Sequence, residues 1–227
     1  MLQVELADIK AFEESLYDRF LSSPVQMVSV MEEGVRNYVR EKKHEVGEEG
    51  DHQWHVTVVS GEEPIGLREI SSRTVSRLVV VRGIVISTSK PYIKARRLKI
   101  QCKHCTHTQF IDLVPGEEPF IPRMCAGQTG EKCPHDPYHP LPDSEVIDVR
   151  TLRLQEILSD LPTGEIARTY QLVADRSNVS KCVPGHRVKV TGVMCLSDMK
   201  SQNLSKGYIY VCGIQRVTDR SNSKCTD

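Results

Sequence analysis

The chain has 227 residues, enough for one large domain or two to three small ones. Hydrophobic residues make up 39% and charged residues 26%, as in a soluble globular protein, and no apolar stretch approaches the roughly 20 residues that cross a bilayer, so we expect no membrane partner. Lys plus Arg and Asp plus Glu each number 30, so the net charge neither indicates nor excludes nucleic acid, and any basic surface must be local.

The N-terminal segment has the pattern of two amphipathic helices. The first apolar stripe has the three- and four-residue spacing of one helical face and contains Ile9, Phe12, Leu16 and Phe20. Ser23, Pro24 and Gln26 then match the start of a second helix, with a capping box and a proline at the first helical position. Its stripe contains Met27, Val30, Met31, Val35 and Tyr38. We expect the two stripes to pack against each other.

From Trp54 on, short strands replace the helical pattern. A short helix is possible at Ser71–Arg77. The expected strands are His55–Val59, Leu78–Ser87, Ile93–Gln101, Val146–Leu154, Thr169–Val173, Arg187–Val193 and Tyr208–Ile214. Because β-branched residues are frequent and no long helix intervenes, the pattern predicts a closed or partly closed antiparallel barrel.

Four of the eight cysteines have the spacing of a metal site. Cys102 and Cys105 form a Cys-x-x-Cys turn, and Cys125 and Cys133 follow in a loop rich in glycine. Two thiolates three positions apart can face one ion, and a second pair completes a tetrahedron. Since the N-terminus has no secretory signal, metal binding is favoured over disulfides. We expect one structural zinc ion, because four thiolates leave no open position for catalysis.

Two alternatives to this zinc site remain open from the sequence. The four thiols can be reduced and unliganded, or one histidine can replace a cysteine. The candidate histidines are His104, His107, His135 and His139. The remaining cysteines show no pairing pattern and are interpreted as small apolar or exposed residues: Cys182, Cys195, Cys212 and Cys225.

Several strings along residues 65–217 resemble the N-terminal region of the minichromosome maintenance (MCM) proteins, the subunits of a hexameric replicative DNA helicase. These strings are Leu78–Val85, Lys94–Cys102, Lys132–Tyr138, Leu152–Glu156, Pro162–Arg168 and Val183–Val188. Within the family, the string Lys132–Tyr138 and the spacing of the second cysteine pair are most similar to the fifth eukaryotic paralogue.

The resemblance implies an α+β fold of several parts. Residues 1–64 would form a helical subdomain, and residues 65–101 with 146–217 a five-stranded oligonucleotide-binding (OB) barrel. Residues 102–145 would form a zinc-binding hairpin inserted in that barrel. Residues 218–227 would be a tail leading to an ATPase domain that lies outside this sequence.

The same resemblance implies a noncatalytic region of a nuclear protein. The sequence contains no Gly-x-x-x-x-Gly-Lys-[Ser/Thr] motif, and the nearest string, Gly127–Lys132, has the wrong spacing. ATP and Mg²⁺ would therefore bind only in the ATPase domain. The implied partners are single- and double-stranded DNA, neighbouring MCM paralogues in a hetero-hexamer and double hexamer, and other replication factors.

The expected DNA contacts lie on one strand and a hairpin. On the strand Ile93–Gln101, alternation places Leu98 and Ile100 on one face and Arg97, Lys99 and Gln101 on the other. The candidate DNA-binding residues are Lys94, Arg96, Arg97, Lys99 and, in a hairpin that also carries Asp198, Lys200 and Lys206. The resemblance further assigns Gly164, Glu165 and Arg168 to a loop that signals towards the ATPase domain.

Two other functions fit the same sequence. The first is a stand-alone, zinc-containing OB-fold protein that binds single-stranded DNA. Such a protein should carry more aromatic residues near its basic strand, where Tyr92 stands alone in the sequence. The second is a structural scaffold whose zinc loop binds other proteins.

Overall fold

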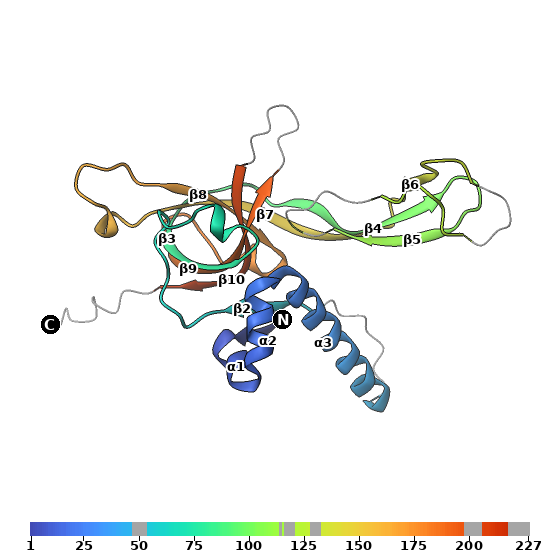
Figure 1. Cartoon of the computed structure of the whole chain (residues 1–227), viewed down its shortest axis with the longest axis horizontal. Coiled ribbons are helices and arrows are strands. Elements are labelled where there is room, and N and C mark those ends of the chain that lie inside the picture. Colours follow the sequence, from blue (N-terminus) through green and yellow to red (C-terminus); the bar gives the residue numbers. More distant parts are fainter. Residues whose placement is uncertain (47–53, 114, 116–120, 128–132, 198–205, 218–227) are drawn as a thin grey trace. The chain divides into compact units, whose positions relative to one another are not determined.

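A computed structural model describes residues 1–46, 54–113, 115, 121–127, 133–197 and 206–217 (Figure 1). The chain divides into two compact units, one of residues 1–90 and 150–227 and one of residues 91–149. The domain borders expected at residues 101/102 and 145/146 lie inside the second unit, and the division into three parts stays a prediction. Among the described helices, none is long and apolar enough to cross a membrane.

The N-terminal segment forms three helices where two were expected. They are α1 (Leu6–Phe12), α2 (Glu14–Ser22) and α3 (Pro24–Val46). The first expected helix is divided at Glu13, whose backbone is extended, with φ −158° and ψ 122°. The carboxylate of Glu13 accepts a hydrogen bond from the hydroxyl of Ser15 in the first turn of α2. The break before Pro24 is confirmed.

The two apolar stripes are only partly buried. Ile9 and Phe20 belong to a buried cluster that also contains Val193, Cys195 and Cys212 of the barrel strands. The helices therefore pack on the barrel as well as on one another. Three stripe residues are wrongly predicted, since they are exposed: Phe12, Val30 and Tyr38. The helix α3 has 23 residues, whereas the elements that it contacts, α2 and β2, have nine and four residues. Its apolar stripe is therefore longer than the surface on which it packs.

A small sheet connects the N-terminus to the segment after the helices. The strand β1 (Leu2–Glu5) pairs in parallel with β2 (Val56–Val59), in register from Leu2 with Val56 to Glu5 with Val59. The strand β2 was expected from the sequence, whereas β1 was not. All four residues of β2 are buried, so this strand lies inside the unit and not at its surface.

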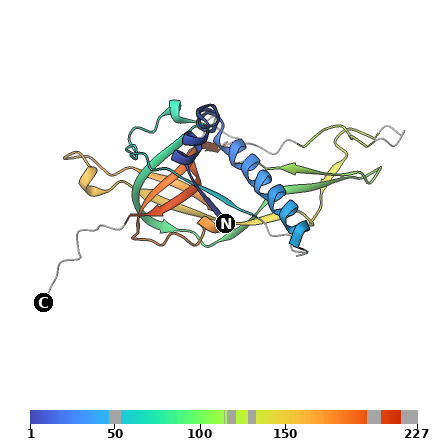
Figure 2. The same cartoon turned by 90° about the horizontal axis from the view of Figure 1, so that it is seen from below.

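Five strands of the described residues close a ring, as the predicted OB barrel requires (Figure 2). They are β3 (Leu78–Thr88), β7 (Glu145–Gln155), β8 (Thr169–Asp175), β9 (Arg187–Ser197) and β10 (Lys206–Arg216). Their order is β3–β9–β10–β8–β7, and β7 pairs with β3 again. The pair β10–β8 is parallel, and β3–β7, β3–β9 and β9–β10 are antiparallel. The expected fold class is confirmed.

The barrel interior is filled by aliphatic side chains, in keeping with the 5% of aromatic residues in the chain. Those that are completely buried include Val81, Val85, Leu154, Leu172, Val188, Val190 and Ile209. Short 3-10 turns connect the strands: η1 (Ser72–Thr74), η2 (Leu158–Asp160) and η3 (Arg176–Asn178). The first of these replaces the helix expected at Ser71–Arg77, because the capping box of Ser71 and Thr74 closes only one turn.

A buried charged network joins α3 to the barrel. Nη1 of Arg176 donates to Oε1 of Glu32 at 2.6 Å, and its Nε donates to Oδ2 of Asp175 at 3.2 Å. The same Oδ2 accepts the hydroxyl of Tyr210 at 2.5 Å. Burial, and then the carboxylate of Asp175, raise the pKa of Tyr210 well above its usual value. Buried charges are tolerated only when paired in this way.

The second unit is built on one long strand. The strand β4 (Tyr92–Cys102) pairs with β5 (Thr108–Asp112), with β6 (Tyr138–Pro140) and with the first residues of β7. All these pairs are antiparallel. The strand expected at Ile93–Gln101 is therefore present, but it lies outside the ring of five. Neither β5 nor β6 was expected.

The strands β10 and β2 approach each other closely at Gly213. A Cβ at Gly213 would fall on the backbone carbonyl oxygen of Val58. Because backbone cannot move aside cheaply, we expect Gly213→Ala to lower the free energy of unfolding by about 1–3 kcal/mol and the Tm by several degrees, measured by circular dichroism.

Gly34 provides the matched control for this substitution. It lies in the exposed middle of α3, and a Cβ there would meet nothing within 4 Å. Gly34→Ala should raise the stability by roughly 0.5–1 kcal/mol, because glycine weakens a helix interior. Equal effects of the two substitutions would contradict the close approach.

Candidate metal centre and nucleic-acid interface

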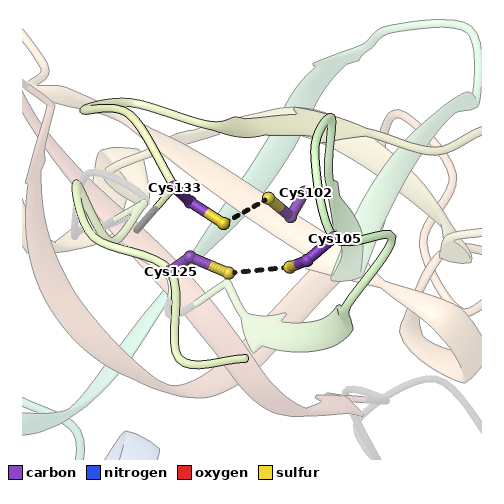
Figure 3. Close-up of side chains that lie close together, drawn as sticks. All are labelled: Cys102, Cys105, Cys125 and Cys133. Carbon is purple, nitrogen blue, oxygen red and sulfur yellow. Dashed lines mark hydrogen bonds between the residues drawn. The ribbon is translucent and has the colours of Figure 1, made fainter. Parts of the chain in front are cut away.

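The four cysteines predicted as ligands lie together in the second unit (Figure 3). Their sulfur atoms all lie within 4.8 Å of one another. The Sγ atoms of Cys102 and Cys133 are 3.8 Å apart, and those of Cys105 and Cys125 are 3.3 Å apart. These distances are too long for a disulfide, in which sulfurs are about 2.05 Å apart. Four zinc–sulfur bonds of about 2.3 Å in a tetrahedron place sulfurs about 3.8 Å apart.

The end of β4 and a tight turn position the first cysteine pair. Cys102 is the last residue of β4, and its amide donates to the carbonyl of His107 at 2.9 Å, which closes the turn. Thr106 adopts the left-handed conformation within it, with φ 56°. The amide of Lys103 donates to the carbonyl of Pro137 at 3.0 Å. This bond holds the turn against the segment that follows Cys133.

Backbone amides point at two of the sulfurs. The amide of His104 donates to Sγ of Cys102 at 3.5 Å, and that of Gly127 donates to Sγ of Cys125 at 3.4 Å. A Cβ on Gly127 would lie 3.0 Å from Sγ of Cys105. The absence of a side chain at residue 127 therefore lets the two turns approach each other. Amides that donate to sulfur favour the thiolate, which is the form that binds metal.

The shifts in the thiol pKa values indicate that the four cysteines can all ionise only beside a cation. Hydrogen bonds from the backbone, first of Cys105 and then of His104, lower the pKa of Cys102. Desolvation and the neighbouring thiols raise the pKa of Cys133 to about 12. Four adjacent thiolates repel one another, so they ionise together only around a positive ion. The donor set therefore fits a metal ion that prefers sulfur.

The histidine and disulfide alternatives find no support in this geometry. The group of ligand atoms within the described residues contains the four cysteines and no histidine. Three of the other cysteines, Cys182, Cys195 and Cys212, are buried in the first unit. Burial raises the pKa of Cys182 to about 11. They are small apolar residues of the interior, as expected, and Cys225 lies outside the described residues.

The predicted basic strand lies in the unit that holds the four cysteines, and three of its four predicted cations lie near a carboxylate. Nε of Arg97 is 2.7 Å from Oδ1 of Asp112. Nζ of Lys99 is 2.8 Å from Oδ2 of Asp143. The pairing of β4 with β7 shifts by one residue between Ala95 and Arg97. The alternation of side chains between the two faces of β4 is therefore interrupted at Arg96.

Two further members of this cluster differ in their surroundings. Nη1 of Arg96 is 3.9 Å from Oε1 of Glu145. Lys94 is exposed near the start of β4. Three of the four predicted contacts on this strand therefore face a carboxylate, which reduces the local positive charge below that expected from the sequence.

Sequence reasoning missed an aromatic residue on this face. Phe110 of β5 pairs directly with Lys99 of β4. The guanidinium carbon of Arg97 lies 5.4 Å from the centroid of its ring, and Nζ of Lys99 lies 5.8 Å from it. The residue was missed because β5 was not predicted. The alternation of exposed and partly buried residues in β5 is a weak signal in a segment of five residues.

The predicted hairpin is described only at its ends. Lys206, the first residue of β10, is exposed and pairs with Ser197 of β9. Lys200 and Asp198 lie outside the described residues. A role of this hairpin in DNA binding stays a prediction.

The predicted signalling loop is held through a residue that the sequence did not indicate. Gly164 adopts φ 86°, and the amide of Glu165 donates to the carbonyl of Pro162 at 3.2 Å, which makes a turn. The carboxylate of Glu165 pairs with the guanidinium of Arg68.

A buried carboxylate anchors this loop. Nε of Arg68 donates to Oε1 of Glu156 at 3.0 Å. The backbone amide of Arg168 donates to Oε2 of the same residue at 2.9 Å. The backbone amide of Arg168 therefore helps to fix the loop. Arg68 is far away in the sequence and belongs to no motif, so no pattern could have indicated it.

Comparison with known proteins identifies the family. The sequence profile described as the MCM OB domain matches residues 66–198. The chain is 34% identical to the DNA replication licensing factor mcm-5 of Caenorhabditis elegans, over 96% of this chain and 31% of that protein. It is 33% identical to mcm5-B of Xenopus laevis, over 96% of this chain and 32% of that protein.

A plant relative extends the same similarity. The chain is 32% identical to MCM5 of Arabidopsis thaliana, over 97% of this chain and 33% of that protein. It thus spans about a third of the length of these relatives. The similarity to the fifth paralogue that the string Lys132–Tyr138 predicts is confirmed. The chain belongs to the MCM family.

Proposed function

We propose that this chain is the N-terminal DNA-binding and ring-forming region of an MCM replicative helicase subunit. The observation that carries the proposal is the combination of a closed five-stranded barrel with a four-cysteine cluster, in a chain similar along nearly its whole length to replication licensing factors. The energy for DNA unwinding would come from ATP hydrolysis in an ATPase domain elsewhere in the full-length protein, which would bind ATP and Mg²⁺. The protein would act in the nucleus.

The metal in this proposal is one zinc ion held by Cys102, Cys105, Cys125 and Cys133. Zinc prefers a tetrahedron of sulfur and nitrogen ligands, and four thiolates close its coordination shell. The zinc would therefore stabilise the loops of the second unit and take no part in chemistry.

DNA binding would be electrostatic and shared between subunits. An OB barrel binds single strands with cations that track the phosphates, and Lys94, Arg96, Arg97 and Lys99 are the candidates here. Because the chain has no net charge, one copy should bind weakly. Six copies around one channel would multiply weak contacts. The proposed partners are DNA, neighbouring MCM paralogues in a hetero-hexamer, a second ring in a double hexamer, and other replication factors.

The first prediction of this proposal concerns zinc content. We expect the purified chain to contain one zinc per molecule by mass spectrometry of the metal, and Cys125→Ser to lose it, because three thiolates bind zinc more weakly than four. Cys182→Ala is the control, since Cys182 is outside the sulfur group. Full zinc retention in Cys125→Ser would refute the assignment.

The second prediction concerns single-stranded DNA. The double variant Lys94→Ala, Arg97→Ala should bind a labelled single strand more weakly in fluorescence anisotropy. It should also lower the slope of log affinity against log salt by at most about 1.4, because each lost phosphate contact to a single strand contributes about 0.7. The double variant Arg40→Ala, Lys42→Ala is the charge-matched control, since both residues are exposed on α3 in the other unit. Equal effects of both variants would mean that overall charge, and not this strand, determines the binding.

A further inference from the structure

One surface feature of the second unit is an exposed aromatic ring that lies close to two cations. The side chain of Phe110 is 54% exposed. The cations of Arg97 and Lys99 lie 5.4 and 5.8 Å from its centroid. A large apolar ring left in water contributes little to folding, and cations within about 6 Å hold it in a fixed orientation. The arrangement therefore leaves the face of the ring accessible to a ligand.

Strand pairing places these three side chains on one face of the β4–β5 hairpin. Arg97 is opposite Asp112 and Lys99 is opposite Phe110. Directly paired residues, and residues two positions apart on a strand, share a face. Leu98 and Ile100 belong to the other face, where Ile100 is fully buried. One face of the hairpin thus fills the interior of the unit, while the other presents an aromatic ring bordered by positive charge.

We propose that Phe110 is a stacking platform for a base of single-stranded nucleic acid, and that Arg97 and Lys99 contact the adjoining phosphates. This inference rests on the proposed DNA-binding function. Aromatic rings beside cations are the usual means by which proteins hold single strands without sequence preference. In a duplex the bases already stack on one another, so the ring has no open base to cover. An apolar peptide would offer no negatively charged group to either cation.

The acidic partners of the cations do not prevent this contact. The side chains of Asp112 and Asp143 are 71% and 84% exposed. Ion pairs at such exposed positions are weak, and a phosphate can exchange for the carboxylate. They do oppose the ligand's charge, so removing one should strengthen binding. We expect Asp143→Asn to bind a single strand at least about twofold more tightly at low salt. Unchanged or weaker binding would take Lys99 out of the phosphate contact.

A tryptophan placed at the platform reports stacking directly. Trp54 is the chain's only tryptophan, so the probe is Phe110→Trp combined with Trp54→Phe. Titration with oligo-dT should quench its fluorescence, saturating at the same concentration as the anisotropy of labelled oligo-dT. The matched control is Phe12→Trp in the same background, at an 82% exposed position on α1, which should not be quenched. Binding that leaves the emission of both tryptophan variants equally unchanged overturns the platform.

Removal of the ring completes the test. Phe110→Leu should weaken single-strand binding by at least about fivefold, because stacking of one base contributes at least about 1 kcal/mol, while the salt slope stays unchanged. Phe110→Tyr should restore the affinity. Zinc content must equal that of the unchanged chain, so that loss of fold is excluded.

The outcomes separate this inference from the function on which it rests. If the double variant Lys94→Ala, Arg97→Ala loses affinity but Phe110→Leu does not, the platform is refuted and the basic strand stands. If the unchanged chain binds no single strand at any salt concentration, both are refuted.

Discussion

The convergence of four sulfur atoms is the constraint on which the second unit depends. Both hydrophobic core clusters of the described residues consist of first-unit residues. Within the described part of residues 91–149, the buried apolar side chains are only Ile100, Cys102, Pro137 and Val149. A unit with so little apolar burial gains too little free energy to order its loops. Cross-linking of two distant turns through the proposed ion would supply the stability that burial does not.

The constraint also positions the surface proposed to bind DNA. Cys102 ends β4 and the turn to Cys105 leads into β5, so the metal ligands stand at the closed end of the β4–β5 hairpin. The exposed ion pairs Arg97–Asp112 and Lys99–Asp143 keep the net positive charge of this surface low. In the proposed function, a surface of this kind would bind single strands weakly in one copy and become effective through repetition in a ring.

The local sequence pattern predicted most of the helices and strands. It failed where contacts with other parts of the chain determine whether a segment is a strand, ends a helix or is buried. The strands of the barrel carry long β-branched runs, so their periodicity is clear. The strands β1, β5 and β6 have four, five and three residues, too few for alternation to be distinguished from loop. The division at Glu13 has no proline or glycine to mark it. Phe12 and Tyr38 are exposed because the surface on which the helices pack does not extend to them. The spacing of apolar residues along a helix does not indicate how long that surface is.

The sequence alone determined the four-cysteine cluster, the barrel class and the family, because each depends on residue types at fixed spacing along the chain. The tertiary structure alone decided which charges meet. Asp112 and Asp143 neutralise the basic strand, Arg68 holds the loop of Glu165 and Phe110 lies close to two cations. These contacts join residues from separate elements, so strand register and loop closure create them, and no spacing in the sequence records them.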